Sequence, residues 1–315
     1  MYDTIIIGAG PAGITAAIYA ARREMKTLII AKEVGGQMVI ASDIENYPGF
    51  NKINNYDLIL KFQEQVKNLG VEIKNTEIKK VEKEGDKFIL FSENEKFEAK
   101  TVITTVGLMP RRLYIKGEEE FIGKGVSYCA NCDGPFFKGK TVVVVGGGNA
   151  ALDAAEVLSK MANKVYLIHR RDEFRGFEVL VEKVKKQENI EILLNSEIKE
   201  IKGEEKVKNI VVINKELSKK TEIAVDGVFV EVGRVASVNL VNGLVELNEK
   251  NEIVVDEKCA SKTEGLFVAG DVTQVPFKQI TIASGQGTIA ALAAYQYLQL
   301  KDGKNVNIVF DRSKK

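Results

Sequence analysis

The stretch TIIIGAGPAG, from Thr4 to Gly13, decides the fold of the amino-terminal part of this chain. Its apolar start predicts a short buried strand, and its glycines predict a tight turn into a helix over Ile14–Arg23. A second apolar strand over Thr27–Ala31 completes a unit of strand, glycine turn, helix and strand. In such units the first glycine permits the turn, the second lets the backbone approach a pyrophosphate, and the third allows helix and strand to pack closely. The pattern predicts an α/β dinucleotide-binding unit.

The residues that would contact a dinucleotide follow from this pattern. The amino-terminal end of the helix presents unpaired N–H groups and the positive end of its dipole to phosphates. Glu33, which follows the second strand, offers a carboxylate to the hydroxyl groups of a ribose. A glycine turn in an α/β domain without a ligand is the alternative interpretation. The candidate residues of the turn are Gly8, Gly10, Ala12 and Gly13.

The same plan recurs later in the chain. A valine-rich strand over Thr141–Val145 precedes the sequence GGGNAA, after which a helix is expected over Leu152–Lys160 and a strand over Lys164–Ile168. Two such units predict two nucleotide-binding domains rather than one. The candidate residues of the second turn are Gly146, Gly148, Asn149 and Ala150.

The segment after the second unit selects its ligand. It reads HRRDEFR from His169 to Arg175, where a site for free ribose hydroxyls would carry an acidic residue. Arginine forks bind a 2′-phosphate, which a carboxylate would repel. A solvated basic cluster is the alternative, since the segment also contains acids. We expect NADPH here, passing a hydride to a second, tightly held dinucleotide, for which FAD is the usual choice. The candidate residues are His169, Arg170, Arg171 and Arg175.

The stretch SYCANCDG, from Ser127 to Gly134, holds two of the three cysteines of the chain. Cys129 and Cys132 are spaced i, i+3, which on one helical turn places them on one face within reach of a disulfide. A zinc site would need two more ligands, and only Cys259 and His169 remain as soft donors. A purely structural disulfide would close a very small loop and stabilise little. The redox interpretation, a CxxC beside a βαβ unit, is therefore favoured.

Thiol chemistry also needs a proton donor. His169 is the only histidine in the chain, and it lies in the basic segment. Asp133, directly after Cys132, is the natural candidate, with a turn residue before Gly134 and Pro135 as the alternative. The single histidine also excludes multi-histidine metal sites, and we expect no metal.

The composition of the 315 residues is that of an ordinary soluble globular protein. Forty-five basic residues nearly balance 44 acidic ones, which indicates neither a nucleic-acid partner nor an anionic membrane. No signal peptide is visible, and no apolar run approaches the ~18 residues of a membrane span. Because three cysteines make no disulfide framework, a cytoplasmic location is expected.

The rest of the chain predicts further strands and one long helix. Val71–Lys100 alternates apolar and charged residues around turns such as Glu84-Gly85-Asp86, which predicts antiparallel strands. Ile190–Val230 shows a similar pattern. Leu266–Asp271 predicts a final buried strand, and Ser284–Leu300 predicts a carboxy-terminal helix.

Together these segments resemble the low-molecular-weight thioredoxin reductases, the NADPH- and FAD-dependent class II of the pyridine nucleotide-disulfide oxidoreductases, over essentially the whole chain. The motifs that carry the resemblance are GAGPAG at Gly8–Gly13, GGQ at Gly35–Gln37, ENYPGF at Glu45–Phe50, CANCDG at Cys129–Gly134, GGGNAA at Gly146–Ala151, HRRDEFR at His169–Arg175, GDV at Gly270–Val272 and KQITIASGQG at Lys278–Gly287. The chain departs from the family's usual pattern at Asn131, where threonine is more common, and at Lys278, where arginine is more common.

The resemblance implies an α/β fold of two Rossmann-like, three-layer ββα dinucleotide-binding domains, with the NADPH domain inserted into a discontinuous FAD domain. The implied FAD domain covers residues 1–112 and 242–315. The implied NADPH domain covers residues 113–241 and carries the CxxC pair, and the implied hinges lie near residues 111–115 and 238–242.

The resemblance also implies roles and partners. Cys132 is then the sulfur nearer the flavin, Cys129 attacks the partner disulfide, and Asp133 is the acid. The implied enzyme is a homodimeric, NADPH-dependent thioredoxin-disulfide reductase that passes electrons through FAD and the disulfide to oxidised thioredoxin or a thioredoxin-like redoxin. Further FAD contacts are implied at Gly36, Gln37, Asn46, Gly270, Asp271, Gln279 and Ile280.

Other functions fit part of the pattern. The same electron path could feed a glutaredoxin-like protein, a peroxidase system or oxygen. A peroxide-system reductase of this type normally carries an extra amino-terminal redoxin region, whereas this chain begins at the first glycine fingerprint. Ferredoxin-linked flavin reductases of similar fold lack the CxxC. A binding module without turnover would keep both glycine fingerprints but would leave the CxxC without a role.

Overall fold

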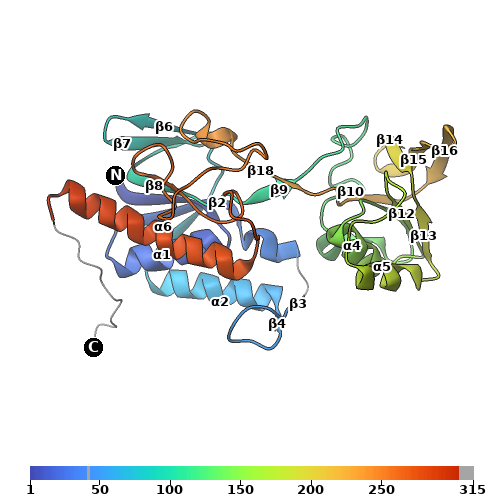
Figure 1. Cartoon of the computed structure of the whole chain (residues 1–315), viewed down its shortest axis with the longest axis horizontal. Helices are drawn as coiled ribbons and strands as arrows, with labels where there is room; N and C mark the ends of the chain where they lie inside the picture. Colours follow the sequence, from blue (N-terminus) through green and yellow to red (C-terminus); the bar gives the residue numbers. More distant parts are fainter. Residues whose placement is uncertain (41–42, 305–315) are drawn as a thin grey trace. The chain divides into compact units, whose positions relative to one another are not determined.

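The computed structural model describes residues 1–40 and 43–304 and divides the chain into two compact units (Figure 1). The first unit combines residues 1–108 with the residues from Ala236 onward, and the second is Met109–Val235. These divisions lie a few residues before the domain boundaries expected at 113 and 242. Two short strands, β9 (Leu108–Pro110) and β18 (Arg234–Ala236), pair with each other where the chain passes between the units.

The first unit is built on a seven-stranded sheet in the order β5-β2-β1-β8-β7-β6, with β19 paired to β8. Neighbouring strands are parallel from β5 to β8 and from β8 to β19, and antiparallel from β8 to β6. The strands are β1 (Tyr2–Ala9), β2 (Thr27–Val34), β5 (Glu72–Asn75), β6 (Lys80–Glu84), β7 (Lys87–Phe91), β8 (Lys96–Thr104) and β19 (Leu266–Val268), and the remaining elements are α1 (Pro11–Arg22), α2 (Asn55–Asn68), α6 (Ile280–Lys301), the short pair β3 (Asp43–Ile44) and β4 (Ile53–Asn54), and the 3-10 turns η1 (Gly36–Ile40) and η3 (Asn239–Val241).

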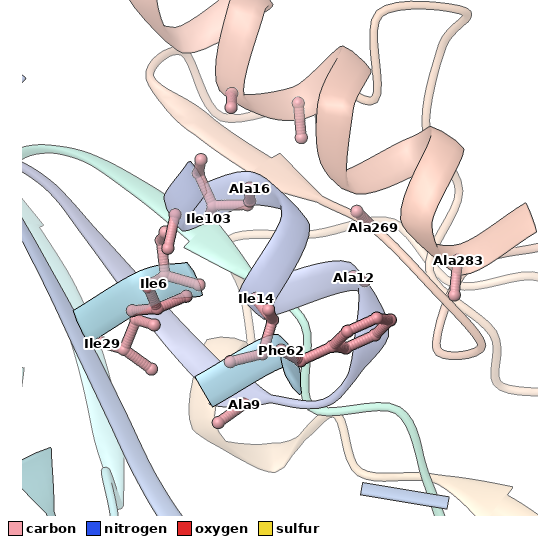
Figure 2. Close-up of a cluster of buried hydrophobic side chains, with 14 of the residues drawn as sticks. Ile6, Ala9, Ala12, Ile14, Ala16, Ile29, Phe62, Ile103, Ala269 and Ala283 are labelled. Atoms are coloured by element: carbon pink, nitrogen blue, oxygen red, sulfur yellow. The ribbon is translucent and has the colours of Figure 1, made fainter. Parts of the chain in front are cut away.

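The alternation of side chains along these strands fills two cores. Ile6, Ile29 and Ile103 lie on the face covered by the three helices, where small residues of α1 and α6 let the helices pack closely (Figure 2). Their neighbours in sequence, such as Ile5 and Val102, lie on the opposite face beneath the β6–β7 hairpin and the residues around Val241. Two packed cores around one sheet give the three-layer arrangement expected for a dinucleotide-binding domain.

The second unit repeats this plan. Its five-stranded parallel sheet runs β10-β17-β11-β12-β13, and a three-stranded antiparallel sheet, β14-β15-β16, covers one face while helices cover the other. The elements are β10 (Val126–Ser127), α3 (Ala130–Asp133), η2 (Gly134–Phe137), β11 (Thr141–Val145), α4 (Asn149–Ser159), β12 (Lys164–Ile168), α5 (Glu178–Lys185), β13 (Ile190–Leu193), β14 (Ser196–Gly203), β15 (Val207–Asn214), β16 (Lys219–Ala224) and β17 (Gly227–Val230).

The structure confirms the expected α/β fold and corrects the pairing expected for the first strand of each alternating stretch. β6 and β7 form the predicted antiparallel hairpin around Gly85, but β5, at the start of the same stretch, pairs parallel with β2. In the second unit β13 likewise pairs parallel with β12 rather than joining the antiparallel sheet. The first strand of each stretch is an edge strand of the parallel sheet. An alternation of charged and apolar residues is the same in such a strand as in a strand of an antiparallel hairpin, so the sequence pattern alone does not distinguish them.

Candidate active site

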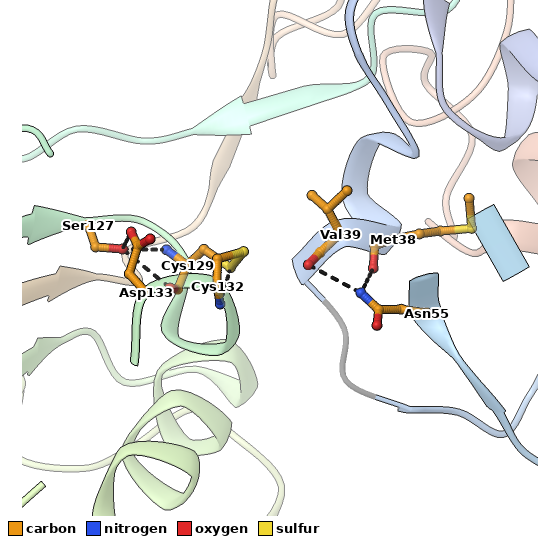
Figure 3. The surroundings of a disulfide bond; sticks show 7 residues. All are labelled: Met38, Val39, Asn55, Ser127, Cys129, Cys132 and Asp133. Carbon is orange, nitrogen blue, oxygen red and sulfur yellow. Dashed lines mark hydrogen bonds between the residues drawn. A yellow bond between two sulfur atoms is a disulfide. The ribbon is translucent and has the colours of Figure 1, made fainter. Parts of the chain in front are cut away.

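The two predicted cysteines form a disulfide at the start of a single helical turn. Cys129 has an extended backbone and caps α3, and its Sγ accepts a hydrogen bond from the Cys132 N–H at 3.1 Å. The Cα atoms of the pair are 5.4 Å apart, and the sulfurs are bonded (Figure 3). The turn follows directly on β10, so the disulfide lies at the carboxyl end of that strand. The prediction that this spacing permits a disulfide is confirmed.

Asp133 completes this turn, and its carboxylate is held by a residue that sequence reasoning did not select. Ser127, only 5% exposed, donates from its hydroxyl to Asp133 Oδ2 at 2.6 Å. The same Ser127 oxygen accepts the Cys129 N–H at 3.0 Å (Figure 3). The carboxylate proposed as proton donor is therefore tied to the backbone of the redox pair through one hydroxyl.

A second buried carboxylate supports the same segment. Glu118 is 2% exposed and accepts the backbone N–H groups of Leu113 at 2.8 Å and Tyr114 at 2.7 Å. It also accepts the phenolic O–H of Tyr128, the residue before Cys129, at 3.0 Å. Burial and this hydrogen bond to Glu118 raise the pKa of Tyr128, so the phenol stays a donor at all physiological pH values. Glu118 thus connects the start of the second unit to the redox turn.

The second glycine turn lies on the same edge of the same sheet. The parallel strands β10 and β11 both end at this edge, with the redox turn after β10 and Gly146 after β11. Gly148 caps α4 with no side-chain partner, which leaves the first N–H groups of that helix available to an anion. Asn149 Oδ1 accepts the Phe177 N–H at 2.7 Å, and the Arg175 N–H donates to the Gly147 carbonyl at 2.7 Å. These bonds place the basic segment against the glycine turn, while Ala150 follows within α4.

His169 packs on the glycine turn with one nitrogen unused. A Cβ added at Gly147 would overlap the imidazole ring, which also stacks on Phe174 with ring centroids 5.6 Å apart. His169 is 7% exposed, and its Nε2 has no hydrogen-bond partner within the described part of the chain. Burial lowers the pKa of His169, and the charges of the three nearby arginines lower it further. A buried, unpaired nitrogen at this place fits a polar ligand in the turn.

The three arginines beside His169 differ in exposure. Arg170 and Arg175 are exposed and Arg171 is half-buried. Across residues 1–40 and 43–304, no ion pair is made by these three guanidinium groups, although the intervening Asp172 and Glu173 lie in the same segment. The three guanidinium groups therefore remain available as hydrogen-bond donors, and such a donor set fits a phosphate.

The first glycine turn is built around a threonine hydroxyl. Gly8 has φ +108°, a conformation that favours glycine, and an added Cβ would lie 2.5 Å from the Thr105 carbonyl oxygen. Thr105 Oγ1 lies 2.9 Å from the Ile7 carbonyl and 3.0 Å from the Gly8 carbonyl, and a Cβ at Gly13 would meet it at 2.6 Å. The glycines at positions 8 and 13 therefore allow the turn to pack closely against Thr105, as the third role of glycine in such turns requires.

The loop after β2 lies beside this turn. The Gly35 N–H donates to the Ala9 carbonyl at 2.9 Å, and a Cβ at Gly10 would lie 3.7 Å from the Gly36 Cα. Gln37 Nε2 donates to the Leu108 carbonyl at 2.7 Å. The buried Asn55 donates to the carbonyls of Met38 and Val39 and so fixes the loop (Figure 3).

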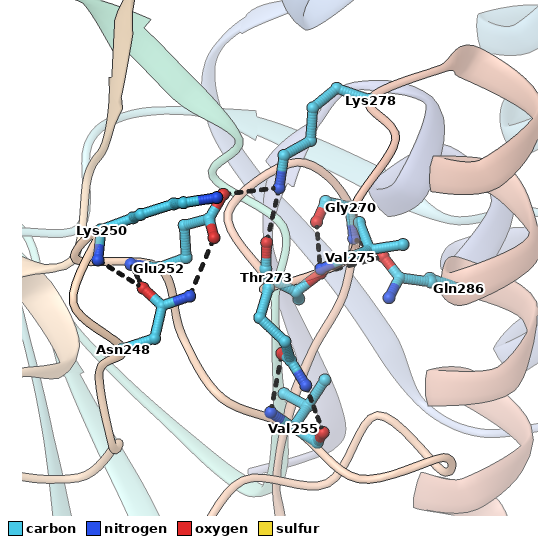
Figure 4. A network of polar contacts seen from close by, with 10 residues as sticks. Asn248, Lys250, Glu252, Val255, Gly270, Thr273, Val275, Lys278 and Gln286 are labelled. Carbon is cyan, nitrogen blue, oxygen red and sulfur yellow. Dashed lines mark hydrogen bonds and ion pairs between the residues drawn. The ribbon is translucent and has the colours of Figure 1, made fainter.

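The carboxy-terminal segment reaches the same edge of the first sheet. The Gln286 side chain accepts the Gly270 N–H at 2.9 Å and the Thr273 hydroxyl at 3.2 Å, which fixes the turn that contains Asp271 (Figure 4). A Cβ at Gly270 would lie 3.0 Å from Cβ of Ala12. Lys278 pairs with Glu252 at 3.0 Å and donates to the Thr273 carbonyl at 2.6 Å (Figure 4).

The remaining candidate residues of the first unit are less tightly connected. Asn46 Nδ2 donates to Gln279 Oε1 at 3.2 Å, so the two loops meet just before α6, whose first residue is Ile280. Glu33 is exposed near the end of β2, on the edge where the glycine turn lies. The residues that sequence reasoning missed are Ser127, Glu118, Thr105, Asn55 and Gln286.

In residues 1–40 and 43–304, no group of three or more histidine, cysteine, aspartate or glutamate side chains is arranged to hold a metal ion. No helix in the same ranges combines the length and apolar character needed to cross a membrane. Cys259 is buried apart from the redox pair, and burial raises the pKa of its thiol to about 12, which makes it unreactive.

The chain is similar to known proteins over nearly its whole length. The family model of the pyridine nucleotide-disulphide oxidoreductases matches residues 2–287. The thioredoxin reductase of Bacillus subtilis (strain 168) is 38% identical over 301 residues, which are 95% of each chain. The crystal structure of Lactococcus lactis thioredoxin reductase in its FR conformation is 39% identical, with a TM-score of 0.86 over 95% of this chain and 99% of that chain. The thioredoxin reductase structure from T. acidophilum is 36% identical, with a TM-score of 0.82 over 94% and 98% of the two chains.

Proposed function

The chain belongs to the pyridine nucleotide-disulphide oxidoreductase family, and we propose that it is a thioredoxin-disulfide reductase that uses NADPH and FAD. One observation carries the proposal: the Cys129–Cys132 disulfide follows β10 on the sheet edge where the second glycine turn follows β11. In this proposal, a nicotinamide cofactor and a reducible disulfide would both lie at one edge of one sheet. The identity to thioredoxin reductases across nearly the whole chain supports thioredoxin as the electron acceptor.

We assign the two units to the two cofactors. The first unit would hold FAD at the Gly8–Gly13 turn, the Gly36 loop and the Gly270 turn, which share one sheet edge. The second would hold NADPH at the Gly146 turn, with the guanidinium groups of the basic segment on the 2′-phosphate. When bound, NADPH supplies a hydride and FAD relays its two electrons to the disulfide.

The side chains of this chain supply the remaining chemistry. Two electrons and two protons convert the disulfide into two thiols, so each reduction of the pair needs protons delivered at the sulfurs. We assign Asp133 as the donor of one of them, because it is the carboxyl group of the redox turn itself. Cys129, proposed as the nucleophile, then attacks the disulfide of the partner, and Cys132 displaces the reduced partner as it re-forms the internal bond.

The surface beside the redox turn suits a protein partner. Phe136 lies in η2, directly after the redox turn, and is 73% exposed, whereas its neighbour Phe137 packs edge-on against Phe229. Aromatic residues, phenylalanine among them, are enriched in protein–protein interfaces. We propose that Phe136 contacts the redoxin. We also propose a homodimer in the cytoplasm, on the strength of the family resemblance and of the cysteine usage that favours a reducing compartment.

Replacement of each cysteine tests the proposal. With NADPH in excess, the wild type should reduce oxidised thioredoxin, and Cys129→Ser and Cys132→Ser should abolish this while the bound flavin still bleaches with NADPH. Cys259→Ala is the matched control and should retain turnover. Parallel assays with a glutaredoxin-like protein, a peroxidase system and oxygen identify the preferred acceptor. A double-cysteine variant that reduces thioredoxin as fast as the wild type would refute the proposed path.

A further inference from the structure

Ser127 is buried beside the redox pair, a location that its neighbours in sequence do not predict. It ends β10, two residues before Cys129, and it is 5% exposed. Its hydroxyl has three neighbours: the Cys129 N–H at 3.0 Å, Asp133 Oδ2 at 2.6 Å and the Cys129 carbonyl oxygen at 3.3 Å. A serine hydroxyl offers one hydrogen and two lone pairs, so this environment matches its full bonding capacity.

The three neighbours allow the Ser127 hydroxyl hydrogen to point in two directions, depending on whether Asp133 is ionised or protonated. When Asp133 is ionised, the Ser127 hydrogen points to the carboxylate, and the oxygen accepts the Cys129 N–H. When Asp133 is protonated, the carboxylic acid can donate to the second lone pair of Ser127, and the Ser127 hydrogen can turn to the Cys129 carbonyl. No heavy atom has to move between the two arrangements, because all three distances are already within hydrogen-bonding range.

We propose that Ser127 is a positioning residue that keeps Asp133 aligned with the redox pair in both of its protonation states. This inference rests on the proposed role of Asp133 as proton donor. The proton balance is simple: Asp133 gives its proton to a thiolate as the disulfide is reduced, and it regains one from water. The Ser127 hydrogen turns toward the carboxylate after the first step and back to the Cys129 carbonyl after the second.

Without the hydroxyl, the half-buried Cys129 N–H loses its partner and the Asp133 carboxyl is free to rotate away. Hydrogen bonds to charged groups are among the stronger ones in proteins, so Ser127→Ala should slow proton-coupled reduction of the disulfide by about tenfold. Asp133→Asn removes the acid itself and should slow it by about a hundredfold. Since Ser127 acts only through Asp133, the double variant should be no slower than Asp133→Asn alone.

The experiment measures reduction of the disulfide directly. The FAD-loaded protein is mixed anaerobically with dithiothreitol and no NADPH, samples are quenched by alkylation, and modification of the two cysteines is followed by mass spectrometry. Ser127→Thr retains a hydroxyl and should remain within about threefold of the wild type if the hydroxyl is what matters. The control is Ser196→Ala, another buried hydroxyl of the second unit, which donates to the Leu194 carbonyl at 2.7 Å and should react as the wild type. In thioredoxin turnover, Ser127→Ala should lower kcat and leave KM for thioredoxin unchanged.

The outcomes separate this inference from the proposed function. A slow Ser127→Ala variant, rescue by threonine and a double variant equal to Asp133→Asn support it. A normal rate for Ser127→Ala beside a slow Asp133→Asn would overturn the inference alone. Losses that multiply in the double variant would overturn it as well, because Ser127 would then act independently of Asp133. A normal rate for Asp133→Asn would overturn the proton-donor role and the inference together.

Discussion

Replacement of Gly148 by alanine separates ligand binding from folding at the second glycine turn. Gly148 caps α4 with φ −99° and ψ −176°, an extended backbone that any residue adopts. A Cβ built at this position meets no protein atom within 4 Å. The adjacent Gly147 is different, because its added Cβ would overlap the His169 ring. The two substitutions therefore make a matched pair, one facing open space and the other facing protein.

The expected magnitudes follow from these contacts. For Gly148→Ala, the smaller entropy of the unfolded chain favours folding by about 0.4–1 kcal/mol. The poorer capping preference of alanine opposes folding by a similar amount, so the free energy of unfolding should change by less than about 0.5 kcal/mol. A methyl group where the pyrophosphate approaches should weaken NADP⁺ binding at least about tenfold, which is about 1.4 kcal/mol. Gly147→Ala forces the His169 ring out of its stack on Phe174 and should cost about 1–3 kcal/mol of stability besides weakening the ligand.

Calorimetry measures both quantities. Titration of NADP⁺ into each FAD-loaded variant gives the dissociation constant without turnover, and scanning calorimetry gives the stability. Gly148→Ala should lose affinity at unchanged stability, and Gly147→Ala should lose both. The reasoning is refuted if Gly148→Ala binds NADP⁺ as the wild type does, or if it is destabilised as strongly as Gly147→Ala.

Three further predictions rest on individual side chains. Arg171→Ala should weaken NADPH binding by about tenfold to a hundredfold through loss of a charged hydrogen bond while leaving NADH binding unchanged, and equal losses for both nucleotides would contradict the assignment. Glu118→Gln should lower the free energy of unfolding in urea by about 2 kcal/mol because it disturbs three buried hydrogen bonds, whereas the exposed Glu119→Gln should change it by less than about 0.5 kcal/mol. Burial raises the pKa of Glu231 from 4.5 to about 7, so folding loses up to about 3 kcal/mol as pH rises through this interval. Glu231→Gln should consequently be more stable than the wild type at pH 8 and not at pH 4, and a gain of equal size at both pH values would show that the charge is not the cause.

The fold was predictable from the sequence where a short local motif is also a known ligand-binding motif. The glycine turns after β1 and β11 are short, contiguous signals, and the structure places both at carboxyl ends of parallel strands. The strands β11 and β12 have the bounds expected from their apolar runs. The parallel pairing of β5 with β2 was not predictable, because a half-exposed edge strand shows the same alternation in a parallel sheet as in a hairpin.

The candidate site was predictable only where a residue type is rare or its motif is specific. Two cysteines with two residues between them and the only histidine are easily recognised in the sequence. Ser127 and Glu118 are not, because serine and glutamate are common surface residues and only burial with particular partners reveals their roles. Thr105 is equally hard to recognise, since it follows the end of β8 and reaches a glycine turn almost a hundred positions away in sequence. Tertiary contacts of this kind leave no local pattern.

An anaerobic titration of the FAD-loaded protein with NADPH, followed by alkylation and mass mapping of the cysteines, tests the central claim most directly. The account predicts that thiols appear at Cys129 and Cys132 in step with NADPH consumed, while the buried Cys259 stays unmodified until the protein is denatured. If NADPH bleaches the flavin but the bond between the two sulfurs remains intact, electrons do not reach the disulfide and the account is contradicted.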